Sequence, residues 1–381
     1  MTLPASPVAP DALEPEIART ARELRLDARS AELDAEPAFP RAEFALLASQ
    51  GWIGLRAPTS LGGRGLPLRR AGRLLWALAH ESGTTFAKLA LQPEFCSVLA
   101  EHGSPELVER WYRPLVQGRT LVGNHVTEPS AGSDAGALAT RAEPSGSDYL
   151  LTGIKSEAAF ATDADAAIVY ARIARPGKDP VGVTAFLVPQ DLPGITKTVI
   201  PDLGERWMRR GTVEYREVRV PASARIGDEG AAFGYLKDEL DRERAVLAAI
   251  YLGVARRSFE QTVEHVGSRA AFGRPLAAQQ GISFPLAEDW AKLDAAELYV
   301  DRVLGRLDSG SAGSPEAALA KWLATSTALE VLDHAIQFHG GRGYSKALPH
   351  EQRWRDVRSG AIAHGPSEIM RLVGARGLWP R

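Results

Sequence analysis

Residues 127–134 have the sequence Thr-Glu-Pro-Ser-Ala-Gly-Ser-Asp, which combines a tight turn, two serine hydroxyls and exposed backbone N–H groups. Such a turn binds negative charge, and hydroxyls add donors without adding a titratable group. The pyrimidine edge of an isoalloxazine ring needs this chemistry, because its carbonyl oxygens and ring nitrogens gain negative charge on reduction. An ordinary surface loop rich in glycine and serine would read the same way. The candidate flavin contacts are Thr127, Gly132 and Ser133.

The chain divides into three regions with different hydrophobic periodicity. The chain has 381 residues, more than one core usually serves, so two or three domains are expected. Residues 1–121 show helical spacing, residues 122–227 contain short strand-like runs separated by Gly and Pro turns, and residues 228–381 return to the helical period. The sequence therefore predicts a mainly α protein with an N-terminal all-α domain, a middle β-barrel or sandwich and a C-terminal helical domain.

Long helices are expected in the last region. One apolar stripe includes Leu247, Tyr251 and Val254, and another runs through Leu286 and Trp290, each in a segment of more than twenty residues. A Ser/Gly linker at 308–314 separates the second segment from a third helix, with Ser314 as its N-cap and Pro315 as its first residue. Long parallel stripes of this kind predict a helix bundle.

Composition excludes several classes of function. A net charge of −2 gives no electrostatic basis for nucleic-acid binding. The lone Cys96 cannot form an intrachain disulfide, and the first twenty residues lack the basic and apolar regions of a signal peptide. No apolar run is long enough to span a membrane. We therefore expect a cytoplasmic protein with neither membrane nor nucleic-acid partners, and we predict no metal site.

Four sequence blocks, in order and at characteristic spacing, resemble the acyl-CoA dehydrogenase family. They are the segment at 127–134, Arg-Ala-Ala-Phe-Gly-Arg-Pro-Leu at 269–276 with Gln279 and Gln280, Gln-Phe-His-Gly-Gly-Arg-Gly-Tyr at 337–344, and Arg-Asp at 355–356 followed by Gly-Pro-Ser-Glu-Ile at 365–369. Residues 54–65 also resemble the family's N-terminal domain. The resemblance covers residues 40–380. It implies a helical domain, a β domain and a four-helix bundle, one FAD per subunit, and a homotetramer or homodimer.

The resemblance assigns a second group of cofactor residues. Arg269 carries a planar cation suited to the FAD pyrophosphate, and in the family the matching residue reaches the cofactor of the neighbouring subunit. The family assigns the same role to Gln337 and the Gly340–Gly341 backbone, and Phe272 and Gln280 complete the group. The alternatives are a surface ion pair for Arg269, a solvated Gln280, and a helix C-cap at Gly340.

Dehydrogenation of a thioester needs a base for the α-proton, while the flavin takes a hydride from the β-carbon. Many family members place a Glu immediately before the Gly at 365, where this chain has His364. One subgroup carries the carboxylate at the start of the first bundle helix instead, and Glu243 falls on that position. Glu243 is therefore the candidate base and His364 the second choice. A solvated face of helix-start acids is the alternative for Glu243.

The remaining assignments concern the substrate and the flavin flank. Asp241 and Arg244 match positions that hold coenzyme A, although an intrahelical ion pair explains them equally simply. Where the family has Trp-Ile-Thr or Trp-Ile-Ser beside the isoalloxazine, this chain has Glu157, Ala158 and Ala159. A carboxylate there would disfavour anionic reduced flavin and change the redox potential or electron acceptor. Pro366 removes a further hydroxyl.

Three functions follow from these residues. The first is FAD-dependent α,β-dehydrogenation of an acyl-CoA, with electron-transfer flavoprotein or oxygen as the electron acceptor. The second is a flavin enzyme of the same fold that works as an oxidase or monooxygenase, or that acts on acyl groups bound to a carrier protein. The third is a helical scaffold that has lost FAD.

Overall fold

The N-terminal part of the chain is helical, as predicted. The computed structural model describes residues 6, 7, 14–175, 177 and 181–379. Helices of this part are α1 (Glu14–Glu23), α2 (Leu26–Ala35), α3 (Arg41–Ser49), α4 (Leu68–Ala90), α5 (Ser97–His102), α6 (Pro105–Leu107) and α7 (Arg113–Val116). Helix α4 is interrupted at Gly83, whose φ of 73° is open to glycine at little cost. The break turns Lys88, in the last part of α4, into the protein interior.

The middle part is a β domain built on one eight-stranded sheet. Its strands are β1 (Val122–His125), β2 (Arg141–Ser145), β3 (Asp148–Ala158), β4 (Ala166–Ile173), β5 (Val181–Pro189), β6 (Ile195–Val199), β7 (Gly211–Pro221) and β8 (Arg225–Ile226). They pair in the order β6-β7-β3-β2-β4-β5-β8, with β1 beside β4. The outer strands β6 and β8 do not pair with each other, so the sheet curls around its own core without closing into a barrel.

Strand β4 shows why the β domain sits firmly against the helices. Ala167 and Val169 point into the core inside the sheet, whereas Ile168 and Tyr170 join the large helical core on the other face. Burial of both faces explains the continuous apolar run of this strand. The sheet and the helices therefore form one packed body around β4.

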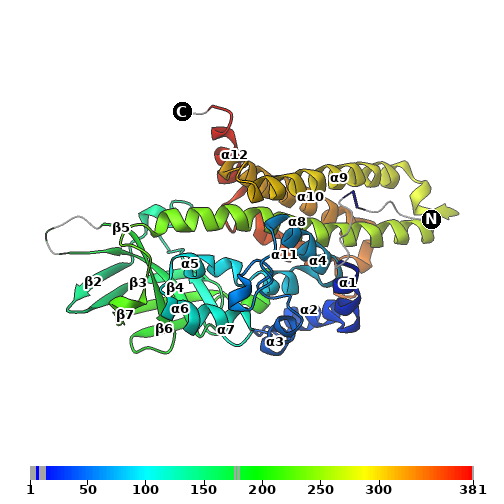
Figure 1. The fold of residues 1–381 in the computed structure, drawn as a ribbon. Coiled ribbons are helices and arrows are strands. Elements are labelled where there is room, and N and C mark those ends of the chain that lie inside the picture. Colours follow the sequence, from blue (N-terminus) through cyan, green and yellow to red (C-terminus); the bar gives the residue numbers. More distant parts are fainter. Residues whose placement is uncertain (1–5, 8–13, 176, 178–180, 380–381) are drawn as a thin grey trace.

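Three long helices make the C-terminal bundle. They are α8 (Ala232–Ser268), α9 (Gln280–Asp308) and α10 (Ser314–Phe338), followed by α11 (His350–Arg358) and α12 (Ser367–Arg376), and a two-stranded ribbon of β9 (Ala270–Ala271) and β10 (Arg274–Pro275) joins α8 to α9. Helix α8 runs from the β domain along the whole molecule, with α9 and α10 beside it (Figure 1). The predicted mainly α architecture with a middle β domain and a C-terminal bundle is confirmed.

Two details of the predicted bundle were wrong. Helix α10 begins at Ser314 itself and Gly313 is its N-cap, so the predicted start was one residue late. Trp290 is 42% exposed and does not belong to the buried stripe of α9, whose buried positions include Leu286 and Leu293.

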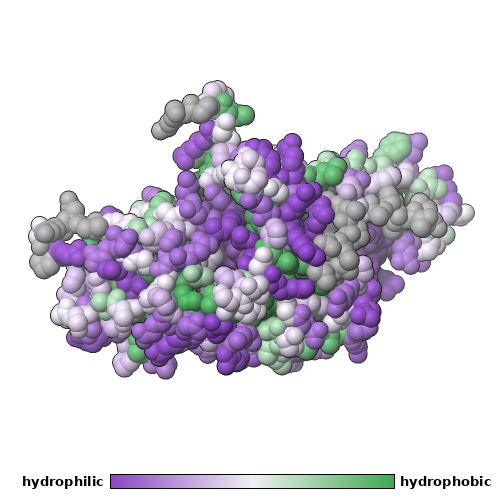
Figure 2. Space-filling model, in the orientation of Figure 1, coloured by the Kyte–Doolittle hydropathy of each residue, from purple (hydrophilic) through white to green (hydrophobic). Residues whose placement is uncertain are grey.

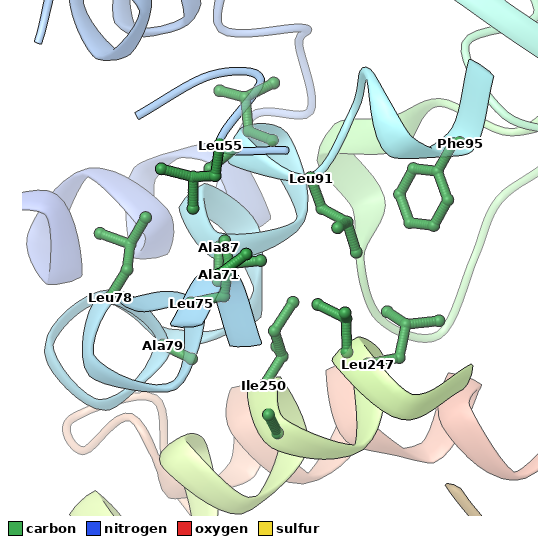
Figure 3. Close-up of a cluster of buried hydrophobic side chains, with 14 of the residues drawn as sticks. Leu55, Ala71, Leu75, Leu78, Ala79, Ala87, Leu91, Phe95, Leu247 and Ile250 are labelled. Carbon is green, nitrogen blue, oxygen red and sulfur yellow. The ribbon is translucent and has the colours of Figure 1, made fainter. Parts of the chain in front are cut away.

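The core is mainly apolar, although it also encloses several charged side chains such as Lys155 and Glu243. Figure 3 shows part of the core, where Leu75 of α4 and Leu91 directly after that helix meet Leu247 and Ile250 of α8. The face drawn in Figure 2 is mainly hydrophilic, with hydrophobic residues in small separate groups. Of the helices within the described residues, none is both long and apolar enough to cross a bilayer.

Candidate functional site

The segment at 127–134 forms an exposed loop between β1 and β2. Glu128 and Ala131 exchange two backbone hydrogen bonds of 3.1 Å, which makes the predicted tight turn. Gly132 and Ser133 beyond the turn are exposed, and their N–H groups make no hydrogen bond to the described backbone. Thr127 is half-buried at the base of the loop. The loop therefore presents free donors to an anionic group, as the sequence predicts.

A buried ion pair that the sequence did not reveal holds this loop in place. The Glu128 carboxylate lies 2.7 Å from Nζ of Lys155 on β3 and accepts the N–H groups of Ala139 and Thr140 at 2.5 and 3.0 Å. Burial opposes ionisation of both groups and lowers the pKa of Lys155 to about 8. For Glu128, the charge of Lys155 and the hydrogen bonds from Lys155, Thr140 and Ala139 together outweigh burial and lower the pKa of its carboxyl. Glu128 thus connects the start of the loop to Ala139 and Thr140 at its end and to Lys155 on β3.

The end of β3 runs beside the loop and brings Glu157 to the same place. The N–H of Ser156 donates to the carbonyl of Thr127 at 2.9 Å. Glu157 follows at a bulge with a φ of 56°, and its exposed carboxylate lies 3.2 Å from the Arg210 guanidinium. Arg210 also donates to both oxygens of the Asp202 carboxylate, at 2.9 and 2.5 Å, so its charge is shared between Glu157 and Asp202.

Glu243 lies inside the protein rather than on a solvated helix face. Its side chain is 2% exposed, and it sits about three turns after α8 begins at Ala232. That distance places it beyond the reach of favourable helix-dipole effects at the N-terminus. Its Oε1 atom is buried without a hydrogen-bond partner in the described structure. The interpretation of Glu243 as one of several solvated helix-start acids is wrong.

His364 is the residue that meets Glu243. Its Nε2 atom lies 3.5 Å from Oε2 of Glu243, which is an ion-pair distance and too long for a well-formed hydrogen bond. The imidazole stacks on Phe95 with the ring centroids 5.4 Å apart. Its Nδ1 atom, like Oε1 of Glu243, is buried without a partner in the described structure. Both candidate bases therefore occupy one site and leave one polar atom each for a ligand.

The surroundings shift the pKa values of Glu243 and His364 in opposite directions. Burial and the nearby carboxylates of Glu239 and Glu94 raise the pKa of Glu243. Burial is the main cause of a lowered pKa of His364, and the positive charges of Lys88, Lys321 and Arg244 lower it further. Both shifts favour the uncharged form of the group concerned.

Glu239 supports Glu243 from one helical turn earlier. It is 1% exposed, accepts the N–H of Val98 at 3.1 Å and the hydroxyl of Ser97 at 3.2 Å, and also accepts from Asn124 at 3.1 Å. Burial raises its pKa to about 8. These bonds connect α5 and β1 to α8 directly beside the candidate base.

Asp241 and Arg244 bond to each other and to the protein. Arg244 Nη1 lies 2.9 Å from Asp241 Oδ1, and Arg244 Nε donates to the carbonyl of His364 at 2.9 Å. Ser314 at the start of α10 donates to the other Asp241 oxygen. The intrahelical ion pair considered for these residues is therefore present in the structure.

The second group of predicted cofactor residues lies at the opposite end of α8. The group comprises Arg269, Phe272, Gln280, Gln337, Gly340 and Gly341, all exposed, with Phe272 98% exposed at the tip of the β9–β10 ribbon. Helix α8 spans about 55 Å between this end and the β domain. Gly340 has a φ of 60° directly after α10, which fits the helix-end alternative. One chain does not bring the two groups together.

Comparison with known proteins settles which family has this arrangement. Models of the acyl-CoA dehydrogenase N-terminal, middle and C-terminal domains match residues 13–119, 123–218 and 230–379. The chain belongs to the acyl-CoA dehydrogenase family. It is a flavin oxidoreductase of the acyl-CoA dehydrogenase type, and its cofactor is FAD.

One relative in sequence and two solved structures illustrate the similarity. Benzylmalonyl-CoA dehydrogenase of Aromatoleum aromaticum is 35% identical over 92% of this chain and 93% of its own. The acyl-CoA dehydrogenase from Geobacillus kaustophilus superposes with a TM-score of 0.90 at 26% identity, covering 98% of this chain and all of the other. A prolyl acyl carrier protein oxidase gives a TM-score of 0.90 at 25% identity, covering 97% of this chain and 100% of its own.

The residues on the β domain of this acyl-CoA dehydrogenase fit FAD at one edge and depart from the family at another. The free N–H groups of Gly132 and Ser133 provide the donors that the pyrimidine edge needs. At the bulge of β3 a Glu157–Arg210 ion pair stands where the family has an aromatic residue. The free donors of this loop therefore fit a bound FAD.

Proposed function

We propose that this protein dehydrogenates an acyl thioester between its α- and β-carbons, and that Glu243 and His364 act together as the base. The observation that carries the proposal is the contact of Glu243 with His364 at 3.5 Å, in which each side chain keeps a second buried polar atom without a partner in the described structure, Oε1 and Nδ1 respectively. FAD, when bound, accepts the hydride that leaves the β-carbon. The protein must take the α-proton and exclude water.

The pair is suited to that proton. Glu243 is the direct acceptor in this proposal: it first passes its own proton to the imidazole of His364, against the pKa shifts of both groups, and its Oε1 atom then accepts the α-proton as a carboxylate. The α C–H bond breaks, the proton bonds to Glu243, and the electron pair forms the new α,β double bond as hydride leaves. The buried surroundings strengthen the attraction between a charged Glu243 and His364.

Anaerobic mixing with a panel of acyl thioesters tests the proposal. The yellow holoenzyme should bleach with at least one thioester, and Glu243→Gln should slow that bleaching at least about a hundredfold. Glu264→Gln, on the exposed side of the same helix, serves as the matched control and should bleach at the wild-type rate. Bleaching of Glu243→Gln at the wild-type rate would contradict the role of Glu243.

A second copy of the chain would complete the cofactor site. The exposed group around Arg269 and Gln337 cannot reach the loop at 127–134 of its own chain, so we propose that it meets the FAD of a partner in a homodimer or homotetramer. Arg269→Ala should then lower FAD content of the purified oligomer without changing secondary structure. A monomeric protein that retains FAD would refute this arrangement.

The flank of the flavin favours a second candidate activity. The Glu157–Arg210 pair replaces the usual neighbours of the ring, and one structural relative is an oxidase of a carrier-protein-bound substrate. In this alternative the electron acceptor is oxygen, in place of an electron-transfer flavoprotein, or the thioester is on a carrier protein in place of coenzyme A. Oxygen consumption during turnover, with both thioester types, separates these possibilities.

A further inference from the structure

Two cations hold three consecutive carbonyl groups in the turn that carries His364. Nζ of Lys321, on α10, donates to the carbonyls of Ala363 and Gly365 at 2.6 Å each. Arg244 Nε, on α8, donates to the intervening carbonyl of His364 at 2.9 Å. All three peptide units of the turn are thus bound from the side of the bundle.

Lys321 has no other evident task. Its side chain is 1% exposed, and no carboxylate of the described residues lies within ion-pair distance of its amine. Burial, then the charges of Arg244 and Lys88, lower its pKa to about 7. A neutral amine still carries two N–H groups, so Lys321 can hold both carbonyls in either protonation state. A buried lysine used only to bind two carbonyls of one turn indicates a local structural role.

The turn needs such support because its backbone is unfavourable. His364 has a φ of 54°, a region that residues with a side chain seldom adopt, and Gly365 follows with a φ of 97°. The φ of Gly365 is strained for any residue that carries a side chain, so this position favours glycine. With its carbonyls turned to α8 and α10, the turn directs the His364 ring toward Phe95 and Glu243.

We propose that Lys321 is a positioning residue that fixes the turn at 363–365 and thereby sets the approach of His364 to Glu243. The role of that approach in catalysis rests on the proposed function, whereas the geometric effect does not. Removal of the amine should let the turn relax, move the imidazole and take away one of the positive charges around it. The charged groups that face His364 are Lys88 from α4, Glu243 and Arg244 from α8, and Lys321 from α10.

The first test observes His364 directly in the holoenzyme, without substrate. Histidine labelled at ring carbon ε1 gives one NMR signal per residue, and the signal missing from His364→Ala identifies His364. In Lys321→Met this signal should shift and titrate at a higher pH than in the wild type, because one repelling cation is gone. Lys292→Met removes an exposed lysine of α9 and should leave it unchanged. An unaltered His364 signal and titration in Lys321→Met would overturn the proposal.

The second test measures coupling by anaerobic flavin reduction. Lys321→Met should slow reduction at least about tenfold in the wild-type background and less than about twofold when His364 is already Ala. Equal losses in both backgrounds would refute action through His364. Lys321→Gln keeps an N–H donor without the charge, so it should raise the His364 pKa with a smaller loss of rate, and it replaces the Met variant if that protein does not fold. If no thioester bleaches even the wild type, the proposed function fails and the NMR titration still decides the role of Lys321.

Discussion

Nε2 of His364 lies 3.5 Å from Oε2 of Glu243, although Glu243 belongs to the first third of α8 and His364 to the turn before α12. The two alternatives for the base are therefore neighbours in one site. A buried acid and imidazole at this distance titrate as a coupled pair, so removal of either partner changes the titration of the other.

The pH dependence of flavin reduction should reveal the coupled titration of Glu243 and His364. In the wild type the base is lost only when the pair takes a second proton, which the lowered pKa of His364 postpones to pH values well below 6.5. In His364→Gln, Glu243 alone must lose its proton, and burial has raised its pKa. The rate of His364→Gln should thus fall at a higher pH than that of the wild type. Stopped-flow reduction between about pH 5 and 9 measures both profiles, and identical acid limbs would show that the pair does not act together.

The ion pair beneath the 127–134 loop should control both stability and FAD retention. Lys155→Met leaves the carboxylate of Glu128 buried without its cation, which should cost about 3–5 kcal/mol. The loop should loosen as well, so the variant should lose FAD on gel filtration. Thermal unfolding and the flavin absorbance per chain measure the two effects. Lys237→Met, an exposed lysine on α8, is the control. Wild-type FAD content in Lys155→Met would argue against a role for this pair in the cofactor loop.

A second buried pair joins the β domain to the helices. Lys88 of α4 contacts Glu205, and Glu205 in turn accepts from Ser359 at 2.6 Å and donates its N–H to Asp356 at 2.6 Å. Lys88→Met should destabilise the protein by about 3–5 kcal/mol because Glu205 is left unpaired, and Lys88→Met with Glu205→Gln should recover part of the loss. Shifts of the thermal unfolding midpoint test this order. A double variant less stable than Lys88→Met would be the contrary result.

Glu157 and Arg210 should move the flavin reduction potential in opposite directions. Glu157→Gln leaves the cation of Arg210, which favours the negatively charged reduced ring, so the potential should rise. Arg210→Gln leaves the carboxylate and should lower it, while the double variant should lie close to the wild type. Redox titration against dyes measures all four proteins. Shifts of the same sign in both single variants would show that this pair does not act on the flavin through its charge.

Much of the architecture followed from local pattern. The helical period before residue 122, the strand-like runs of the middle region and the return of the helical period all correspond to observed elements. The 127–134 segment forms the expected exposed turn because its Pro, Ser and Gly residues specify one locally. The burial of Trp290 on α9 was predicted wrongly. Periodicity shows that a helix has an apolar stripe, but it does not show how far along the stripe a neighbouring element packs.

The sequence alone was sufficient to predict the family, the flavin-binding motif and the two candidate bases. Each of these depends on residue types at fixed spacing along the chain, which a sequence shows directly. Tertiary structure decided how these residues meet. The crossing of α8 by the 363–365 turn brings His364 to Glu243, and the length of α8 separates Arg269 from the loop at 127–134. Neither is visible in sequence, since a contact between distant segments depends on helix lengths and on the packing of buried faces, which no local pattern contains.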